Sequence, residues 1–284
     1  MLFSEHLVIV RGGGDLATGV VYRLHKAGFP VIVLELAQPL VVRRRVALAT
    51  AVLDGEIQIE DLHARLVPTW QAALDLTPTP TIPVLISPTL PTPQSSPSAA
   101  PFRIPRSAFR ILVDARMAKR NIDTRIDQAP LVVALGPGFT AGVDCHAVVE
   151  TMRGHSLGRV IWRGAALPNT GTPGVVAGKG AERVLRAPAA GVVAWRLEIG
   201  DFVKADELVG TVAGAPVRAP FDGVVRGLIA PGTAVHAGLK IGDVDARAER
   251  GACFTISDKS LAIGGAVLEA ALTFLNGRRP TPDG

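Results

Sequence analysis

The chain has few cysteines, few aromatic residues and no long apolar run, and each shortage narrows its class. With two cysteines among 284 residues, we expect neither a disulfide framework nor a metal site. Aromatic residues make up 5%, so valine, leucine, isoleucine and alanine must build the core. No segment approaches the roughly 20 apolar residues of a membrane helix, and we see no signal-peptide pattern. We therefore expect a cytoplasmic protein with no membrane span.

Positive charge is modest and dispersed along the chain. The formal net charge is +5, and the one tight basic cluster is Arg43-Arg44-Arg45. Nucleic-acid-binding proteins usually gather such charge on one face and interleave it with aromatic rings, so we expect no nucleic-acid partner. The length and the 48% of apolar residues allow two domains, each with its own core.

The N-terminal region shows the pattern of a parallel sheet. An apolar run at residues 6–10 precedes helical spacing over 15–27, and residues 31–34 are apolar again. Two strands joined by one helix usually lie parallel in one sheet. We predict a Rossmann-like α/β domain over residues 1–175 that contains a proline-rich loop at 77–106. Its further strands are predicted at 83–86, 111–114 and 131–135.

A glycine-rich turn, RGGGDLATG, joins the first predicted strand to the helix. Gly12, Gly14 and Ala17 match the dinucleotide-binding pattern G-x-G-x-x-A, in which small residues let a pyrophosphate approach the amides of the helix N-terminus. Glu35 ends the next strand, where an acidic residue can bind ribose hydroxyls. A purely structural turn is the alternative. The predicted nucleotide site comprises Gly12, Gly13, Gly14, Asp15 and Glu35.

Charged residues on both sides of this turn complicate the prediction. Asp15 would cap the helix well, but its carboxylate would repel a phosphate. Arg43 and Arg44 begin a helix predicted over 43–53, and they could hold a 2′-phosphate or another anion. A solvated charge run at the start of a helix explains them equally well.

A second glycine-rich turn, GPGFTAG, follows the strand at 131–135. Gly136 and Gly138 could let successive amides converge on an anion. Cys145 and His146 come soon after, but adjacent residues of a strand point to opposite faces, so a buried cysteine is the commoner explanation.

Paired strands are predicted around the turn RGHSL, residues 153–157. Arg153 and His155 could bind a phosphate or carboxylate there, or could be solvated. Arg153 joins the predicted anion site. The candidates for catalysis are Cys145, His146 and His155, and no metal site is predicted.

The C-terminal region contains an internal repeat of short apolar strands and turns. The halves match at Ala187-Pro188 with Ala219-Pro220, Gly191 with Gly223, Gly200 with Gly232, Val203 with Val235, and Gly210 with Gly242. One half cannot bury its apolar face alone, so we predict that the two interlock over residues 183–250. A helix predicted at 260–274, within a last segment 251–284, would pack on the α/β domain.

The repeat resembles biotinyl and lipoyl carrier domains, which implies an all-β barrel-sandwich hybrid. Those domains carry their cofactor on a lysine in the hairpin between the halves, whereas TVAGAPVRAP at this position lacks a lysine. The resemblance therefore implies the fold without the carrier function, used for docking or ligand contact. We expect Lys240, Asp243 and Asp245 in exposed charged turns, with cation binding as the alternative.

Several stretches together resemble the YqeB-type family of selenium-dependent molybdenum hydroxylase system proteins. They are residues 11–35, 43–52, 113–121, 135–174, 238–247 and 256–272. The resemblance covers almost the whole chain except the proline-rich stretch. Ala246 departs from it, since the family more often has proline there. The resemblance implies a role in the maturation or cofactor handling of these hydroxylases.

We therefore expect an accessory protein that binds a nucleotide across the two glycine turns. The ligand would be NAD(P), FAD or the dinucleotide form of molybdopterin, and the partners would be a molybdenum hydroxylase or its maturation proteins. An NAD(P)-dependent oxidoreductase and a non-catalytic docking scaffold are the alternatives. A homo-oligomer is also compatible with the sequence.

Overall fold

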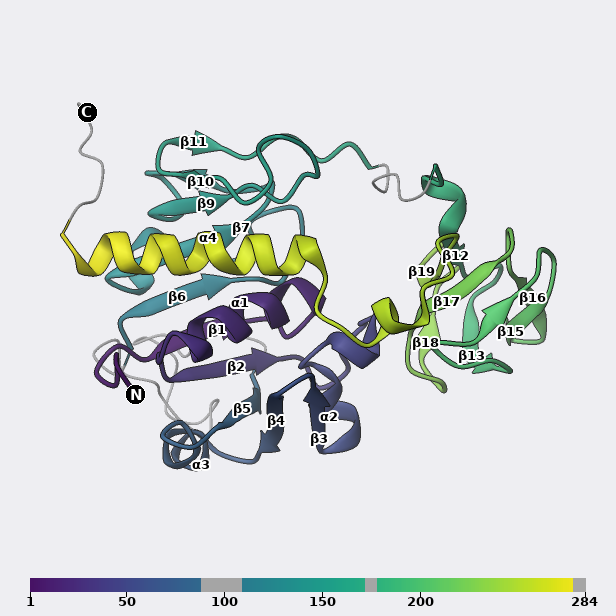
Figure 1. Ribbon diagram of the computed structural model, residues 1–284, viewed down its shortest axis with the longest axis horizontal. Helices are drawn as coiled ribbons and strands as arrows, with labels where there is room; N and C mark the ends of the chain where they lie inside the picture. Colours follow the sequence, from purple (N-terminus) through teal and green to yellow (C-terminus); the bar gives the residue numbers. More distant parts are fainter. Residues whose placement is uncertain (88–108, 172–177, 278–284) are drawn as a thin grey trace. The chain divides into compact units, whose positions relative to one another are not determined.

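The computed structural model describes residues 1–87, 109–171 and 178–277, which divide into two compact units (Figure 1). Unit 1 comprises Met1–Pro39, Leu48–Asn169 and Ser257–Gly284, and unit 2 comprises Leu40–Ala47 and Thr170–Ile256. The predicted boundary at residue 175 lies outside the described residues. The division differs from the prediction because a short N-terminal segment, residues 40–47, belongs to unit 2.

Unit 1 is built on a nine-stranded sheet of order β10-β9-β7-β6-β1-β2-β5-β4-β3. Neighbouring strands run parallel except at the two edges, where β3 pairs with β4 and β10 with β9 in antiparallel fashion. A separate small sheet pairs β8 (Thr140–Ala141) with β11 (Gly164–Ala165). The nine strands are β1 Val8–Arg11, β2 Val31–Glu35, β3 Glu56–Ile59, β4 Leu62–Val67, β5 Thr81–Ile86, β6 Ile111–Asp114, β7 Leu131–Leu135, β9 Ala147–Val149 and β10 Val160–Ile161.

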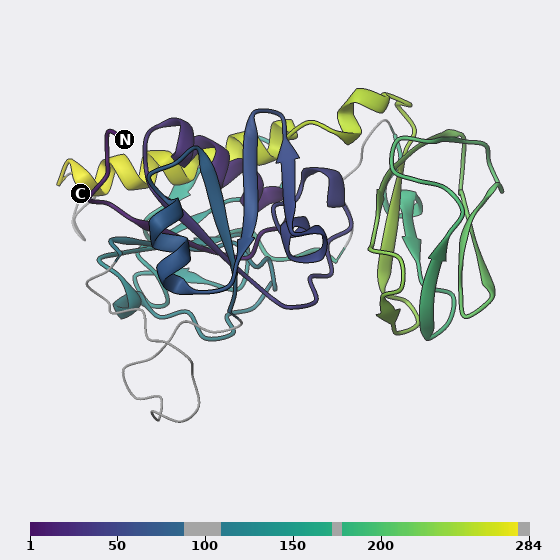
Figure 2. The ribbon, with the colours of Figure 1, turned by 90° about the horizontal axis from the view of Figure 1, so that it is seen from below.

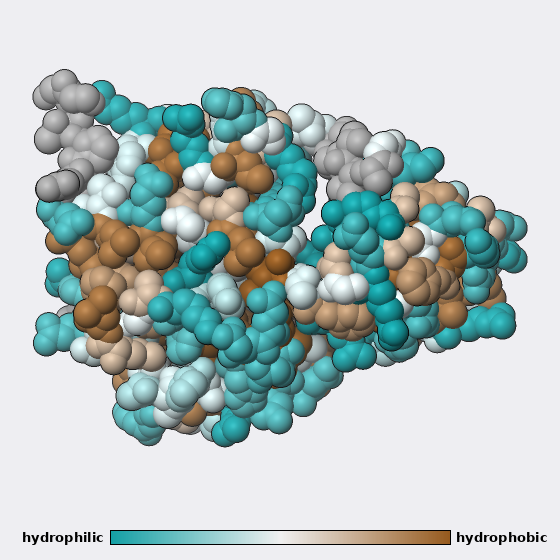
Figure 3. All heavy atoms as spheres, viewed as in Figure 1, coloured by the Kyte–Doolittle hydropathy of each residue, from teal (hydrophilic) through white to brown (hydrophobic). Residues whose placement is uncertain are grey.

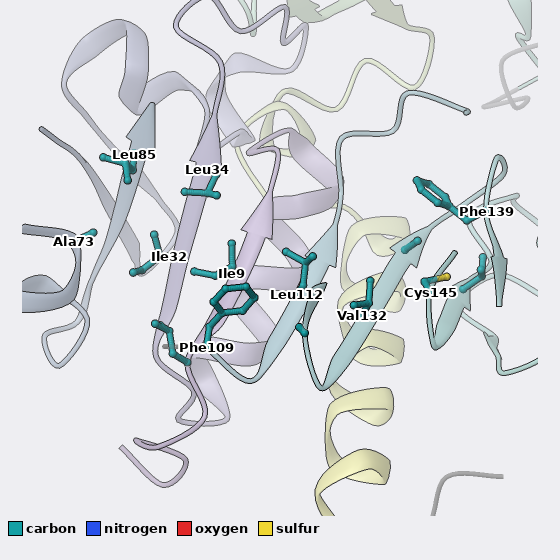
Figure 4. Close-up of a cluster of buried hydrophobic side chains, with 14 of the residues drawn as sticks. Ile9, Ile32, Leu34, Ala73, Leu85, Phe109, Leu112, Val132, Phe139 and Cys145 are labelled. Carbon is teal, nitrogen blue, oxygen red and sulfur yellow. The ribbon is translucent and has the colours of Figure 1, made fainter. Parts of the chain in front are cut away.

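Helices cover both faces of this sheet. The helices are α1 Asp15–Lys26, α2 Thr50–Asp54, α3 Trp70–Leu76 and α4 Asp258–Leu275. Figure 4 shows Ile9, Ile32, Leu112 and Val132 on one face, with Ala73 of α3, whereas α1 and α4 lie behind the sheet. Strand residues alternate between faces, so the intervening valines of β1 and β7 point toward α1 and α4. Both faces are buried, as parallel sheets require.

Most elements that the apolar pattern predicts in unit 1 are present. The strand–helix–strand unit is β1, α1 and β2, and the predicted paired strands are β9 and β10. The prediction missed β3, β4 and α3. Most of the predicted proline-rich loop, residues 88–106, lies outside the described residues, and β5 precedes it.

The helix predicted over residues 43–53 is wrong. Arg44–Val46 form one 3₁₀ turn, Ala47 is extended, and only Thr50–Asp54 are α-helical. The reason is a long-range contact, because Arg43 forms a parallel bridge with Leu228 of unit 2. That contact outweighs the local helical spacing.

Unit 2 consists of two four-stranded antiparallel sheets, ordered β12-β19-β17-β14 and β16-β15-β13-β18. Each sheet takes two strands from each half of the repeat, so the halves interlock through the sheets themselves. The hairpin β15–β16 turns at Ala213 and Gly214, both with positive φ, and offers no lysine. The strands are β12 Val184–Arg186, β13 Gly191–Trp195, β14 Phe202–Val203, β15 Leu208–Val212, β16 Ala215–Arg218, β17 Gly223–Leu228, β18 Ala234–Val235 and β19 Lys240–Asp245.

Asp243 and Asp245 do not lie in exposed turns, contrary to the prediction. Both are buried in β19 and paired with arginines: Asp243 with Arg183 at 2.5 Å, and Asp245 with Arg226 and Arg247 at 2.6 Å each. The arginines take the place of the cation that we considered. Burial alone would raise the pKa of Asp245, but hydrogen bonds from Arg247 and the charge of Arg226 lower it to about 2.

This depressed pKa predicts an acid-sensitive component of stability. A carboxyl group whose pKa is lower in the folded state contributes its full stabilisation above about pH 4 and loses it as the pH falls toward 2. We expect Asp245→Asn to be less stable than the wild type at pH 7 and to lose less stability between pH 4 and 2. Urea unfolding at several pH values measures both; parallel pH profiles for the two proteins would contradict this assignment.

Candidate functional site

The strand order of the sheet reverses at β1: the strands that follow it first are added on one side of it, and β6 and β7 are added on the other. From β1 the chain continues through α1 to β2 on one side, and it later returns to place β6 and then β7 on the other side of β1. Parallel sheets bind ligands outside the carboxyl ends of their strands at such points. The segments there are Gly12–Asp15 after β1 and Ala115–Arg120 after β6.

The three glycines after β1 have different surroundings. Gly12 has φ +92°, and a Cβ on it would lie 3.0 Å from the Arg116 Cα. A Cβ on Gly13 would lie 2.7 Å from the backbone nitrogen of Ala49, which donates a hydrogen bond to the Gly13 carbonyl. A Cβ on Gly14 would meet no atom within 4 Å. The fold itself therefore requires Gly12 and Gly13 but not Gly14.

Glu35 lies at the end of β2, beside this turn. Its carboxylate accepts hydrogen bonds of 2.7 Å from the amides of both Gly13 and Leu36. One amide of the turn is thus already bonded to a carboxylate, and Glu35 holds the turn in place.

The second glycine turn is filled by its own chain. A Cβ on Gly136 would lie 2.5 Å from Thr151 Oγ1, and a Cβ on Gly138 would lie 2.5 Å from the Arg120 Cα. The segment Arg116–Arg120 therefore contacts both turns, in agreement with the position of β6 between β1 and β7. Gly136 and Gly138 are explained by this packing, and β6 lies between the two strands that the turns follow.

The N-terminal ends of α1 and α4 lie together beside Gly14 (Figure 1). Ser260 Oγ donates a hydrogen bond to the carbonyl of Asp15 at 2.5 Å and accepts one from the Gly19 amide at 3.1 Å. Ser257 caps α4 by accepting from the Ser260 amide. Two helix N-termini thus direct their partial positive charges to one place.

Charged side chains of both signs surround these helix ends. Arg153 makes a bidentate ion pair with Asp258 at 2.8 and 3.0 Å, and Lys119 Nζ donates to Asn169. Burial, followed by the charge of Arg153, lowers the pKa of Lys259. Within the described residues, Lys259 has no carboxylate at ion-pair distance. The sequence predicts Ser257, Asp258 and Lys259 in an exposed charged turn and assigns no role to Lys119, because only the fold brings these distant segments together.

A buried ionic network supports the loop after β6. Arg11, at the end of β1, pairs with Asp123 at 2.6 Å, and Asp114, at the end of β6, pairs with Arg116 at 2.6 Å. Thr124 Oγ1 joins the network by donating to Asp114. Met117 and Lys119 in this loop have positive φ, which is uncommon for residues other than glycine. In the sequence, this network is indicated by a charged residue at the end of each of two buried strands, Arg11 in β1 and Asp114 in β6.

Arg43 and Arg44 belong to unit 2 and bond to its backbone. The Arg43 guanidinium donates to the Ala252 carbonyl at 3.1 Å, and Arg44 Nε donates to that of Leu228 at 2.7 Å. Arg44 also lies 3.6 Å from Glu198. These contacts explain both arginines as part of the structure of unit 2.

The three candidates for catalysis do not form a group. Cys145 is fully buried in the core of Figure 4, and burial raises the pKa of its thiol to about 12. His146 Nδ1 accepts from the Val132 amide, near the beginning of β7, so it lies at the opposite end of the strands from Gly12–Asp15. His155 is an exposed residue of the β9–β10 loop.

We expect both cysteines of the native protein to react slowly with an aromatic disulfide at pH 8. Cys145 and Cys253 are buried, and with a pKa of about 12 only about one Cys145 thiol in ten thousand is ionised at that pH. The assay is a time course of released thiolate, with unfolded protein as the two-thiol reference. Rapid release of one equivalent from folded protein would restore Cys145 or Cys253 as a reactive group.

The described residues contain neither a cluster of metal ligands nor a helix that could span a membrane. Among residues 1–87, 109–171 and 178–277, no three histidine, cysteine, aspartate or glutamate side chains gather in a way that could hold a metal ion. None of the helices in the described ranges combines the length and the apolar character needed to cross a membrane.

The chain is similar in sequence to a known protein over most of its length. No family model matches the chain. Structural similarity is low for an aspartoacylase family protein of Mesorhizobium loti, with TM-score 0.21, 18% identity and coverage of 22% of this chain and 23% of that one. It is also low for a succinylglutamate desuccinylase/aspartoacylase of Rhodobacter sphaeroides, with TM-score 0.24, 13% identity and coverage of 84% and 86%.

The sequence relative is the uncharacterized protein YqeB of Escherichia coli K12, which is 46% identical over 273 residues. The match covers 96% of this chain and 48% of YqeB, so the chain spans about half the length of this relative. A match of this length extends over both units. The chain is therefore a homologue of YqeB over about half the length of that protein.

Proposed function

We propose that unit 1 binds a nucleotide, with its phosphates at the N-terminal end of α1. The observation that carries the proposal is Gly14. It precedes α1 with φ −64° and ψ 177°, a conformation open to any residue, and nothing fills the space where its side chain would be. A glycine that neither conformation nor packing requires is explained by a ligand that approaches the backbone closely.

The surrounding charges give this site a defined polarity. Lys259 and Lys119 add positive charge to the two helix N-termini, and Arg153 is held by Asp258. Asp15 opposes a phosphate at the α1 end, so the amides of the helix and the lysines must outweigh its charge. The Glu35 carboxylate accepts a hydrogen bond from the Gly13 amide and so stabilises the turn. Glu35 therefore has a structural role besides any contact with a ribose.

The proposed biological role is that of an accessory protein in molybdenum hydroxylase maturation. It rests on the resemblance to the YqeB-type family, and it makes the dinucleotide form of molybdopterin, or its nucleotide precursor, the preferred ligand. Cys145 and His146 lie far along the strands from Gly14, so neither can donate a proton to a ligand there. Two of the three candidates for catalysis are thus too far from Gly14, which weakens the oxidoreductase alternative and leaves His155 as its candidate proton donor.

Titration calorimetry with NAD, NADP, FAD, CTP and molybdopterin species tests the proposal. We expect at least one of these ligands to bind the folded wild-type protein with one site per chain. Absence of binding by every ligand, from protein shown to be folded by circular dichroism, would contradict nucleotide binding.

The substitution Gly14→Asp tests ligand binding without disturbing the fold. Aspartate is a favourable residue before a helix and would meet no atom here, so the variant should unfold at the wild-type temperature or slightly above it. Its carboxylate would occupy and repel the phosphate position, and we expect affinity to fall at least tenfold. Gly14→Ser is the matched control, of similar stability and without charge; it should lose less affinity. Unchanged affinity in Gly14→Asp would place the ligand elsewhere.

A further inference from the structure

The three lysines of unit 1 differ in their surroundings. Lys26, at the C-terminal end of α1, pairs with Asp61. Lys119, in the loop after β6, is exposed and donates a hydrogen bond of 2.9 Å to the side-chain oxygen of Asn169, which is neutral. Lys259 is half-buried in the first turn of α4. Among the residues that the structure describes, neither Lys119 nor Lys259 has a carboxylate at ion-pair distance.

Both of these lysines belong to segments that contact the turn after β1 and the start of α1. Ser260, the residue after Lys259, donates a hydrogen bond to the carbonyl of Asp15, and Figures 1 and 2 both show α4 alongside α1. The loop that carries Lys119 packs against Gly12, so closely that Gly12 has no room for a side chain. The two ammonium groups therefore lie on the side of the sheet edge where the nucleotide is proposed to bind.

Charged residues gather at this end of α4. Apart from Glu269, the charged residues of the helix are Asp258 and Lys259 in its first turn, whereas its C-terminal half presents an apolar surface (Figure 3). Arg153, from the β9–β10 loop, pairs with Asp258 at 2.8 Å. Three separate segments thus bring one basic residue each to this place, and the third of these residues is Lys119.

The charges around Lys259 act on it unequally. Burial lowers the pKa of Lys259 most, and the charges of Arg153 and Lys119 act in the same direction. Asp15 and Glu150 attract the ammonium group, but they do not restore its pKa. The basic residues are therefore close enough to repel one another.

Two of the nearby carboxylates already have other partners. Glu150 is 2% exposed and accepts hydrogen bonds from the amides of Met152 and Leu167 at 2.6 and 2.7 Å. Asp258 is held by Arg153. Gathering like charges without a counter-ion is unfavourable, and an anion that binds between them removes this cost. A ligand is therefore the expected source of the missing negative charge.

We propose that the ligand has a free terminal phosphate, as nucleoside diphosphates and triphosphates do, and that Lys119 and Lys259 bind this phosphate. The inference rests on the proposed nucleotide site and names its substrate class. A terminal phosphate carries about 1.5–2 negative charges at pH 7, which matches two ammonium groups. Each phosphorus of the pyrophosphate in NAD or FAD has a single ionisable oxygen, so its charge is smaller. The phosphate nearer the nucleoside would lie at Gly14.

The backbone of Lys119 supports a role in binding. Its φ of +61° is uncommon for a residue other than glycine. Such conformations persist where the surrounding structure holds them, and they are frequent where a side chain must reach a ligand. An ammonium group on a flexible stem donates hydrogen bonds in several directions, which suits a phosphate that can rotate.

Titration calorimetry of the full chain tests the substrate class. The ligands are the mono-, di- and triphosphates of cytidine, adenosine and guanosine, together with NAD and FAD. We expect the best triphosphate to bind about tenfold or more tightly than its monophosphate, because charge-assisted hydrogen bonds are added, and more tightly than NAD and FAD. Equal affinity for the monophosphate, or tighter binding of NAD or FAD, would overturn this inference and leave nucleotide binding intact. Binding of none of these ligands would contradict both.

Two methionine variants test the assignment of the lysines. Lys119→Met and Lys259→Met should each weaken triphosphate binding about tenfold or more, since each removes a hydrogen bond between charged groups, and should change monophosphate binding much less. Methionine has a similar length and no charge, so both variants should unfold near the wild-type temperature. Lys26→Met, at the opposite end of α1, is the matched control and should change neither affinity. Equal losses for the two ligands, or unchanged triphosphate affinity, would overturn the assignment.

Discussion

Gly264→Ala is expected to lower the free energy of unfolding by about 3 kcal/mol or more. The new methyl group would lie 2.1 Å from the carbonyl oxygen of Gly19, which is backbone and cannot rotate away. Inserting atoms into a packed core costs about 1–3 kcal/mol when side chains can adjust, and here two helices must separate. Because Ser260 on α4 also bonds to Asp15 and Gly19, that separation would disturb the candidate site.

Gly265→Ala is the control for this prediction. It introduces the same methyl group one residue further along the same helix, where no atom lies within 4 Å. We expect it to raise stability by about 0.5–1 kcal/mol through helix propensity. Urea unfolding followed by circular dichroism measures both variants. Similar free energies for the two would show that α1 and α4 do not cross as described.

Asp114→Asn is expected to cost about 3 kcal/mol or more. Asp114 is 1% exposed and accepts hydrogen bonds from Arg116 and Thr124 at the point where β6 ends. Removing one partner of a buried ion pair typically costs about 3–5 kcal/mol, and since Arg116 keeps Asp123 at 2.8 Å, we expect the lower end of that range. Arg11 is itself buried and bonds to Thr124, so the loss would spread to the end of β1.

Asp127→Asn provides the comparison for Asp114→Asn. Asp127 also pairs with an arginine, Arg125 at 3.2 Å, but both side chains are more than half exposed. Exposed pairs contribute about 0–1 kcal/mol. Thermal unfolding should therefore separate the two variants clearly, and an equally small effect at Asp114 would mean that water reaches the network.

Local sequence signals predicted the parts of unit 1 in which neighbouring residues decide the structure. The alternation of apolar runs and helical spacing located β1, α1, β2, β6, β7 and α4, because each buries a continuous apolar face. The internal repeat likewise predicted that two halves share their sheets. The edge strand β3 and its neighbour β4 mix polar and apolar residues, so their patterns are weaker, and both were missed.

Long-range contacts explain what the sequence could not predict. Arg43 and Arg44 follow a helical pattern, but their partners lie 209 and 184 residues later in unit 2. Asp243 and Asp245 appear to be surface residues until Arg183 and Arg226 are brought beside them. The sequence does not distinguish the three glycines after β1. Only the structure shows that Arg116 and Ala49 leave no room for a side chain at Gly12 and Gly13, whereas Gly14 has room for one.

Hydrogen–deuterium exchange of the full chain, with and without the tightest ligand of the calorimetric panel, tests the central claim most directly. We place that ligand between the N-terminal ends of α1 and α4. We therefore expect slower exchange on binding in peptides covering residues 12–18 and 257–262, and little change in peptides covering unit 2. Protection confined to unit 2, or to the turn at Gly136–Gly142, would contradict the account.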